Sequence, residues 1–316
     1  MYNTFVSVVC VVNSSLDLQK IKPFFEAIHP VCLSSFSDFE YIIVNNVPNL
    51  DLSANISPLD EATKKMIYLI SLSNRVDKNN ALLAGLDRSN GDYTLIYDWE
   101  HAKNPNLIKQ LFEKTRAGND IVYLRAKEKK IKLKFRLFYA IFHFIIRHFS
   151  KLKIDENAFD TRIISRRALN SLLRLRENLR YMKAIYSLVG YRTAFIEVDG
   201  VILKEDGDFR DRFNTSLVAV TSFTTFLRSL LLWIFIFSFL FLIGVVINAL
   251  KVKFTGIDLF GNVGEALGGW TFLVVLISVF FAITFLNLYI MSIYLSNIYN
   301  EIKQRPLYLI ESVRRF

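Results

Sequence analysis

Short apolar runs alternate with segments of helical periodicity in the first part of the chain. The runs that read as strands are Phe5–Val12, Tyr41–Val44, Met66–Leu72, Tyr93–Tyr97 and Ile121–Leu124, and the intervening segments that read as helices are Leu18–Ile28, Asn79–Ser89 and Asn106–Thr115. Short β-branched runs separated by helices are typical of parallel strands that are buried on both faces. The pattern therefore predicts an α/β fold with a doubly wound, mostly parallel sheet. Its site is expected beyond the carboxyl ends of the strands.

Two long apolar segments follow near the C-terminus. No charged residue occurs in 229–250 or in 266–300. A helix of roughly 20 apolar residues is enough to cross the hydrocarbon core of a bilayer, which is about 30 Å thick. We therefore expect a transmembrane helical hairpin, with helices over 229–250 and 270–295 and an external loop over 251–269.

The positive charges around this hairpin predict its orientation. Lys and Arg flank both of its outer ends, as Arg210, Arg212 and Arg228 before it and as Lys303, Arg305, Arg314 and Arg315 after it. Because cytoplasmic flanks carry the excess of Lys and Arg, we expect a cytoplasmic domain over 1–210 and a cytoplasmic tail over 296–316. The expected location is the cytoplasmic (inner) membrane, which the chain crosses more than once.

The net charge of +10 over 316 residues admits either nucleic acid or an anionic membrane surface as partner. The sequence carries no nucleic-acid-binding motif, and its basic residues gather beside apolar segments, which favours the bilayer. The two cysteines, Cys10 and Cys32, are expected to be reduced thiols.

Residues 129–153 combine aromatic bulk with positive charge at helical spacing. Phenylalanines recur every three or four residues on one face, and basic side chains such as Lys132 and Arg136 lie on another. This pattern predicts an amphipathic helix at the membrane interface, and 211–228 is a second candidate for such a helix. The alternative for 129–153 is an ordinary amphipathic helix that packs on the domain.

Candidate chemistry lies directly after the strand Tyr93–Tyr97, in the sequence Asp98-Trp99-Glu100. Two carboxylates beyond the end of a parallel strand can bind a divalent metal, Mg²⁺ or Mn²⁺, that also holds a diphosphate. The alternative is a solvated turn, because acidic pairs are common in loops.

At this point the chain resembles the polyisoprenyl-phosphate glycosyltransferases of glycosyltransferase family 2, which have the GT-A fold (dolichol-phosphate mannose synthase-like, bacterial two-span type). The resemblance rests on an ordered set of segments: Ser7–Ser15, Tyr41–Pro48, Leu72–Asp87, Asp98–Pro105, Ile121–Arg125, Asp160–Arg167, Glu177–Arg180 and Tyr294–Ile310. It implies inverting transfer of a sugar from a UDP- or GDP-linked donor to polyprenyl (undecaprenyl) phosphate. It also implies a homo-oligomer, with a tetramer as the expected form.

The resemblance assigns roles to particular residues. Asp98 and Glu100 take the position of the metal motif, and Asp160 and Arg162 are further catalytic candidates. The nucleotide-sugar candidates are Asn13, Asn45, Asn46, Lys78, Lys204 and Arg210, and the lipid-phosphate candidates are Arg125, Lys132 and Arg136. The alternative for the arginines Arg125 and Arg162 is a structural ion pair.

The chain also departs from the family pattern. Asn45 and Asn46 stand where the family has paired aspartates, Glu100 replaces an aspartate, and the basic loop is reduced to Gly207–Arg210. These changes motivate an alternative function, a catalytically weak or inactive relative that acts as a binding or assembly partner in a membrane glycan pathway. A processive polysaccharide synthase is disfavoured because the chain lacks that group's tryptophan motif and additional spans.

Overall fold

The computed structural model describes the chain except for residues 131–132, 151–154, 156, 176–181, 204–219, 221–223, 258–268 and 304. The chain divides into two compact units. The sheet unit contains Met1–Ala140, Leu152–Thr215 and Gln304–Phe316, and the hairpin unit contains Ile141–Lys151 and Ser216–Lys303.

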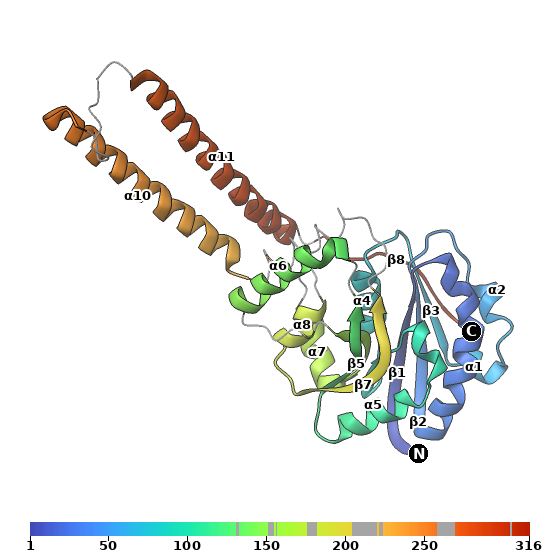
Figure 1. The fold of residues 1–316 in the computed structure, drawn as a ribbon. Helices are drawn as coiled ribbons and strands as arrows, with labels where there is room; N and C mark the ends of the chain where they lie inside the picture. Colours follow the sequence, from blue (N-terminus) through green and yellow to red (C-terminus); the bar gives the residue numbers. More distant parts are fainter. Residues whose placement is uncertain are drawn as a thin grey trace. The chain divides into compact units, whose positions relative to one another are not determined.

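The sheet unit is built on an eight-stranded sheet (Figure 1). Its strands are β1 (Tyr2–Val12), β2 (Phe36–Asn45), β3 (Ile67–Leu72), β4 (Tyr93–Ile96), β5 (Ile121–Lys130), β6 (Ala158–Ser165), β7 (Thr193–Leu203) and β8 (Ile310–Arg315). They lie in the order β7-β5-β6-β4-β1-β2-β3-β8. Strands β1 to β4 run parallel and β7 runs parallel to β5, whereas β6 and β8 are antiparallel to their neighbours. The expected mostly parallel sheet is confirmed.

Helices cover both faces of this sheet. They are α1 (Leu18–Ser35), α2 (Ser53–Ile56), α3 (Glu61–Lys64), α4 (Lys78–Arg88), α5 (Leu107–Arg116), α7 (Arg166–Arg174) and α8 (Met182–Leu188), with 3-10 turns η1 (Ser15–Asp17) and η2 (Trp99–Lys103). Helices α1 and α5 contact each other and one face of the sheet, and α4 and α7 contact each other and the sheet. The expected strands and helices of the first 130 residues are all present, whereas β6, β7, β8, α7 and α8 went unpredicted.

The strands alternate their side chains between two apolar layers. Val8 and Cys10 of β1 belong to the same buried cluster as Phe24 of α1. Val9, the residue between them, faces α4, where a Cβ added at Gly85 would lie 2.5 Å from Val9 Cγ1. Glycine at position 85 therefore allows α4 to lie close against the sheet.

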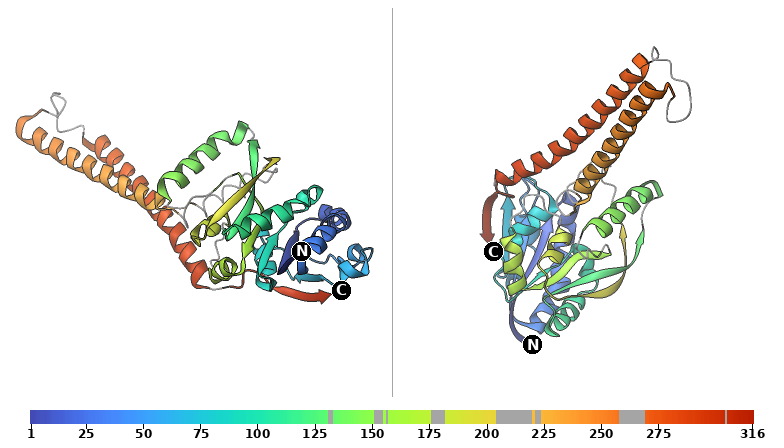
Figure 2. Two further views of the ribbon diagram at one scale, coloured as in Figure 1. Left: turned by 90° about the horizontal axis from the view of Figure 1, so that it is seen from below. Right: turned by 90° about the vertical axis from the view of Figure 1, so that its left-hand side faces the viewer.

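The last strand returns to the sheet from the far end of the sequence. Strand β8 pairs with β3 in antiparallel register, from Tyr68 opposite Arg315 to Leu72 opposite Ile310. Figure 2 shows it as the red arrow at the edge of the sheet. The segment expected to be a tail, 296–316, thus completes α11 at its beginning and contributes an edge strand near its end.

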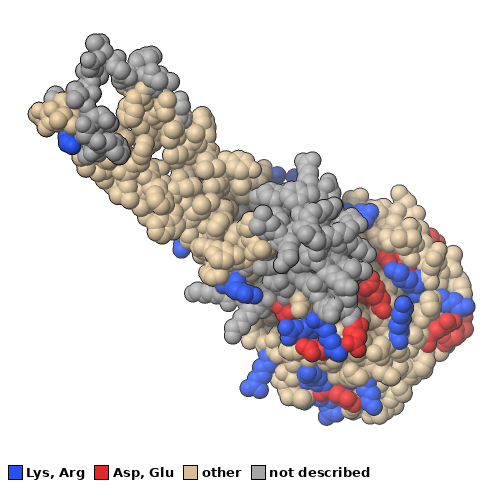
Figure 3. Space-filling view, viewed as in Figure 1, with Lys and Arg blue, Asp and Glu red and all other residues tan. Residues whose placement is uncertain are grey.

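The hairpin unit consists mainly of α10 (Phe226–Thr255) and α11 (Gly269–Ile302), which contact each other, for example through Phe241 and Phe280. The stretches long and apolar enough to cross a membrane are Phe226–Val252, with 27 residues, and Val275–Tyr299, with 25 residues. Each exceeds the roughly 20 residues that a span requires. Large apolar side chains point outward along them, and the visible face of the hairpin carries no charged side chain between its ends (Figure 3). These features indicate a membrane-associated protein.

The expected interfacial segments are only partly described. Helix α6 (Leu133–Phe149) occupies most of 129–153, and within its second half Phe142 and Ile145 are buried while Ile141 and Phe144 are exposed. Its position at the membrane interface stays a prediction. Most of the second candidate, 211–228, and of the expected loop, 251–269, lies outside the described residues, and Phe226 already begins α10.

Candidate active site

The expected site lies where the strand order reverses. β1 has β2 on one side and β4 on the other, so the chain connections leave β1 and β4 in opposite directions along the sheet. Ligands of doubly wound sheets bind at such a switch point, beyond the carboxyl ends of the strands. Asn13 follows β1 and Asp98 follows β4 by two residues, so both predicted residues lie at this position.

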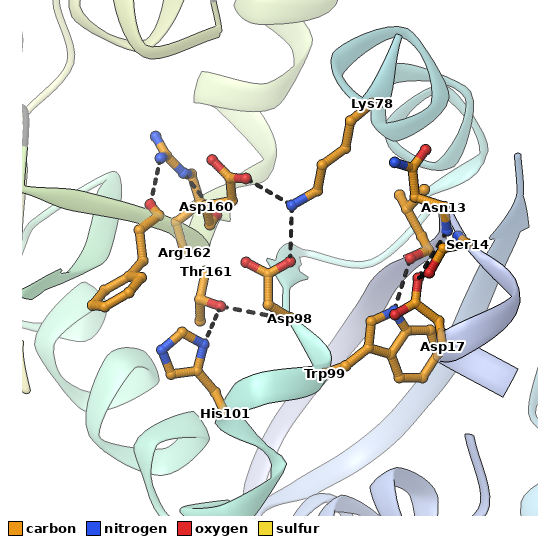
Figure 4. A network of polar contacts seen from close by, with 12 residues as sticks. Asn13, Ser14, Asp17, Lys78, Asp98, Trp99, His101, Asp160, Thr161 and Arg162 are labelled. Carbon is orange, nitrogen blue, oxygen red and sulfur yellow. Dashed lines mark hydrogen bonds and ion pairs between the residues drawn. The ribbon is translucent and has the colours of Figure 1, made fainter. Parts of the chain in front are cut away.

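A lysine ammonium joins two carboxylates at this edge. Nζ of Lys78, the first residue of α4, donates to Asp98 Oδ1 at 3.3 Å and to Asp160 Oδ2 at 2.9 Å (Figure 4). Strand register explains why the two acids face each other: β4 and β6 are antiparallel with Ile96 opposite Arg162, so Asp160 lies opposite Asp98 two residues further along. Three residues from separate parts of the sequence therefore converge on one point.

A second set of bonds fixes the backbone beneath Asp98. The Asp98 N–H donates to Thr161 Oγ1 at 3.1 Å, and Thr161 Oγ1 is also hydrogen-bonded to His101 Nδ1 at 2.9 Å. Burial lowers the pKa of His101, which keeps its ring neutral. The structure places His101 partly buried against Phe159, because the short turn η2 folds it back toward β6.

The three charges change one another's ionisation. Burial raises the pKa of Asp98, and the nearby Asp160 charge adds to this effect against the opposing influence of Lys78. For Asp160, burial is outweighed by Lys78, which lowers the pKa. Burial also tends to lower the pKa of Lys78, but the two carboxylates outweigh it and raise that pKa. The lysine is thus held in its charged form by the two neighbouring acids.

The arrangement fits a single cation at the point between Asp98 and Asp160. Carboxylate oxygens are the ligands that Mg²⁺ and Mn²⁺ prefer, and Mg²⁺ is usually held by one or two carboxylates together with substrate phosphates. Among the described residues no group of three or more His, Cys, Asp and Glu side chains could enclose a metal. A metal here would therefore depend on oxygens from a bound phosphate or from water.

The structure gives the predicted metal ligand Glu100 a less central position. Its side chain is exposed on η2 and makes no hydrogen bond or ion pair with the described residues. Trp99, between the two acids, is buried, donates from Nε1 to Val11 O at 2.8 Å and packs on Phe24. Asp160 of β6, and not Glu100, is therefore the acid that shares the Lys78 ammonium with Asp98.

The two asparagines in the position of the family's aspartates are buried and hydrogen-bonded. Asn46 is fully buried; its Nδ2 donates to Asn13 Oδ1 at 2.7 Å and to Val76 O at 2.8 Å, and its Oδ1 accepts from Val76 N at 2.9 Å. Asn45 Nδ2 donates to Leu50 O at 2.7 Å. These amides tie together the loops that follow β1, β2 and β3, and an aspartate at 46 could not make both donations.

The loop after β1 has an additional anchor that the sequence analysis missed. Oδ2 of Asp17 accepts from the backbone N–H groups of Asn13 and Ser14, each at 3.1 Å. A Ser-x-x-Asp spacing at 14–17 is the signal that could have found it, since it matches a capping box. This anchor fixes the backbone of Asn13 beside the site.

The predicted arginines are both occupied by protein partners. Arg162 is buried, donates to the carbonyl oxygens of Phe159 (2.8 Å) and Asp160 (3.1 Å), and stacks over the Tyr186 ring at 3.7 Å. This geometry favours a role in positioning Asp160. Arg125 pairs with two carboxylates, 3.4 Å from Asp155 and 3.9 Å from Glu197. Its role toward a lipid phosphate stays a prediction.

Of the remaining predicted residues, the structure describes only one. Arg136 lies in α6, whereas Lys132, Lys204 and Arg210 lie outside the described residues. Their expected roles toward the lipid phosphate and the nucleotide sugar stay predictions.

Comparison with known proteins adds a family assignment. The family model described as Glycosyl transferase family 2 matches residues 8–173, which is more than half of the chain. This range contains Asn13, Lys78, Asp98 and Asp160, the residues brought together in the sheet unit.

Named relatives match over most of their length. A prophage bactoprenol glucosyl transferase homolog of Escherichia coli K12 is 28% identical over 285 residues, which cover 88% of this chain and 90% of that protein. The bactoprenol glucosyl transferase of Shigella phage SfX is 29% identical over 285 residues, covering 87% and 89%. Among solved structures, a mannosyltransferase of Pyrobaculum calidifontis in complex with GDP-Man and Mn²⁺ covers 68% of this chain and 61% of its own, with 15% identity and a TM-score of 0.43.

Proposed function

Because the chain belongs to glycosyltransferase family 2, we propose that it transfers a sugar from a nucleotide-sugar donor to polyprenyl phosphate at a membrane surface. The observation that carries the proposal is the extent of similarity to proteins named bactoprenol glucosyl transferases. An aligned length of 285 residues exceeds the 225 residues that precede α10, so the similarity includes part of the hairpin as well as the sheet unit. A lipid acceptor agrees with a catalytic unit that is joined to two apolar helices.

The proposed reaction needs little acid–base chemistry from the protein. A phosphate oxygen of the acceptor attacks the anomeric carbon of the sugar, and the bond between that carbon and the nucleoside diphosphate breaks with inversion. The acceptor is already an anion, so it does not have to lose a proton to a general base. Positioning of the two substrates and neutralisation of the leaving diphosphate are then the main contributions.

The residues at the switch point supply these contributions. A divalent cation, when bound, would neutralise negative charge on the departing diphosphate. Asp98 and Asp160 are the residues that we expect to hold it, and Arg162 keeps the Asp160 backbone in place through two carbonyl contacts. Asn13, Asn45 and Asn46 shape the neighbouring loops into which the nucleotide would fit. Direct contact of these amides with the nucleoside is part of the proposal.

The hairpin unit contains a cavity whose chemistry suits the acceptor. It has a volume of about 540 Å³, and its lining is mostly apolar: Thr224, Thr225, Arg228, Leu231, Met291, Tyr294, Leu295 and Ile298. Arg228 is exposed and forms no ion pair with the described part of the chain. An isoprenoid phosphate combines an apolar chain with one anionic head, so we expect its first isoprene units in this cavity and Arg228 near its phosphate. Insertion in the inner membrane and the tetramer implied by the family resemblance belong to the same proposal.

A transfer assay tests the proposed function. The full chain in detergent is mixed with a short polyprenyl phosphate, Mg²⁺ or Mn²⁺, and UDP- and GDP-linked sugars, with UDP-glucose first because the relatives are named glucosyl transferases. We expect a lipid-linked sugar from one donor, lost on chelation and in Asp98→Asn. Glu26→Gln is the matched control, since Glu26 is an exposed acid of α1 whose ion pair is with Lys22.

The contrary result is equally clear. If folded wild-type protein transfers no sugar from any donor and binds no nucleotide, the chain is a non-catalytic partner, and the proposal is wrong. Transfer that persists fully in Asp98→Asn would leave the reaction in place and remove the switch point as its site.

A further inference from the structure

Lys78 lies at an unfavourable position for a lysine by the rules of helix stability. It is the first residue of α4, directly after the N-cap Asp77, whose side chain accepts from the Asn79 N–H at 2.9 Å. The N-terminus of a helix carries partial positive charge, which disfavours a cation there. Helix stability therefore gives no reason for this lysine, whereas its two contacts with carboxylates do.

The contacts of Lys78 occupy the oxygens that a metal would need. Its Nζ lies 3.3 Å from Asp98 Oδ1 and 2.9 Å from Asp160 Oδ2. A divalent cation binds carboxylate oxygens at about 2.0–2.6 Å, so one that joined both acids would occupy the space between them that the ammonium fills. Two positive charges at that separation also repel each other. The ammonium and the metal therefore exclude each other from the point between the two acids.

The lysine side chain has the freedom to leave. Its side chain is 44% exposed, and its backbone belongs to the first turn of α4 rather than to the segments that carry the acids. A lysine is a point charge on a flexible four-carbon stem, so its ammonium can move without displacing the backbone. Asp160 instead lies within strand β6, and the backbone of Asp98, two residues beyond β4, is held by its hydrogen bond to Thr161.

We propose that Lys78 is an internal competitor of the divalent cation: its ammonium holds Asp98 and Asp160 together in the empty site and is displaced when the metal binds. Once displaced, the ammonium stays within reach of the site and is free to meet the diphosphate that accompanies the metal. This inference rests on the proposed function only for the presence of a metal at Asp98. As a consequence, the affinity of the protein for the metal is lower than the affinity that Asp98 and Asp160 would have without Lys78.

Metal binding to the full chain, without donor or acceptor, tests this inference. Free Mn²⁺ is measured by electron paramagnetic resonance at constant pH for wild type, Lys78→Met and Lys78→Arg. Removing two partly exposed ion pairs and a like charge should lower the Kd for Mn²⁺ roughly tenfold in Lys78→Met. Lys78→Arg keeps the charge and should remain near wild type.

Two controls assign the effect to the site. Lys109→Met removes a lysine of α5 that pairs with a single carboxylate, Glu113, at 3.9 Å, and it should leave the Kd unchanged. Asp98→Asn should abolish the tight binding in the Lys78→Met background. Circular dichroism checks that each variant retains its secondary structure.

Equal or weaker Mn²⁺ binding in Lys78→Met overturns the inference, as does absence of binding in both wild type and Lys78→Met. The transfer assay then separates the two proposals. If wild type still forms the lipid-linked sugar, the proposed function stands and only the competition is wrong; if it does not, both are wrong.

Discussion

The buried amide of Asn46 offers a sharp test of what asparagine contributes at a position where the family resemblance predicts aspartate. Asn46→Asp keeps the shape of the side chain but replaces the NH₂ group with an oxygen. That oxygen would face two acceptors, Asn13 Oδ1 and Val76 O, which lie 2.7 and 2.8 Å from Nδ2. The Val76 carbonyl cannot turn away without moving the loop after β3, whereas the side-chain amide of Asn13 can flip and present its NH₂ group.

The cost therefore follows from the Val76 contact. A buried acceptor that loses its donor costs about 1–3 kcal/mol, so the free energy of unfolding should fall by about that amount. This is a large part of the roughly 5–15 kcal/mol that stabilises an ordinary domain. The new carboxyl would also have a raised pKa, because burial and the facing Val76 carbonyl disfavour its charge. Its folded-state pKa then exceeds its unfolded one, so the penalty is smallest below the unfolded pKa and grows as the pH rises through the folded one.

Thermal unfolding of the full chain in detergent, followed by tryptophan fluorescence, measures the effect. A drop in Tm of roughly 2–12 °C is expected at pH 7, with a smaller drop at pH 5. Asn45→Asp removes one donated bond, to Leu50 O, and should cost about as much. Asn106→Asp is the matched control, since Asn106 is exposed at the N-cap of α5, where Asp serves as well as Asn. A Tm for Asn46→Asp equal to that of Asn106→Asp would refute the reasoning.

Three further predictions concern binding of the acceptor, packing of the core and stability at low pH. Arg228→Gln should raise the KM for polyprenyl phosphate roughly tenfold, because one charge-assisted contact with the phosphate is lost, and should change the KM for the donor little. An equal rise in both KM values would contradict the assignment of this cavity to the acceptor. Gly85→Ala should destabilise by about 1–3 kcal/mol through its clash with Val9, and Val9→Ala in the same chain should restore much of the loss in thermal unfolding. Burial tends to raise the pKa of Asp120, but hydrogen bonds, first of all the one from Arg167, lower that pKa overall. The charged Asp120 therefore stabilises the fold above about pH 3.9, the unfolded value, and this stabilisation is lost as the pH falls through the lower folded pKa. Asp120→Asn should therefore flatten the pH dependence of Tm below that pH, and an unchanged slope would exclude this pair as a source.

The first five strands were predictable because each is a local signal. Phe5–Val12, for example, is a run of buried β-branched residues whose state follows from its own composition. Strand β8 carries no such signal: its residues are mostly exposed, three of its six are charged, and its partner β3 lies more than 200 residues earlier. Strand β6 mixes polar and apolar residues and inserts antiparallel between β4 and β5, which sequence order alone does not indicate.

In the candidate site, too, the residues that follow a local sequence signal were predictable, and their tertiary contacts were not. Asp98 was predictable because it directly follows a recognisable strand, and Lys78 and Asp160 were identified only through the family resemblance. Their meeting point depends on the β4–β6 register and on where α4 begins, and both are tertiary facts. Thr161 was missed because a single threonine in a strand of mixed polar and apolar residues gives no sign that it will support the backbone of Asp98.

Strand β8 makes completion of the eight-stranded sheet a late event in the synthesis of the polypeptide. Its residues leave the ribosome only after both helices of the hairpin, so β3 has an unpaired edge throughout synthesis and insertion of α10 and α11. If α10 and α11 each cross a bilayer, pairing of β3 with β8 requires an even number of crossings, since both strands belong to one sheet. A polypeptide whose second helix failed to insert would then leave β8 on the opposite side of that bilayer, with the edge of β3 open to aggregation or proteolysis.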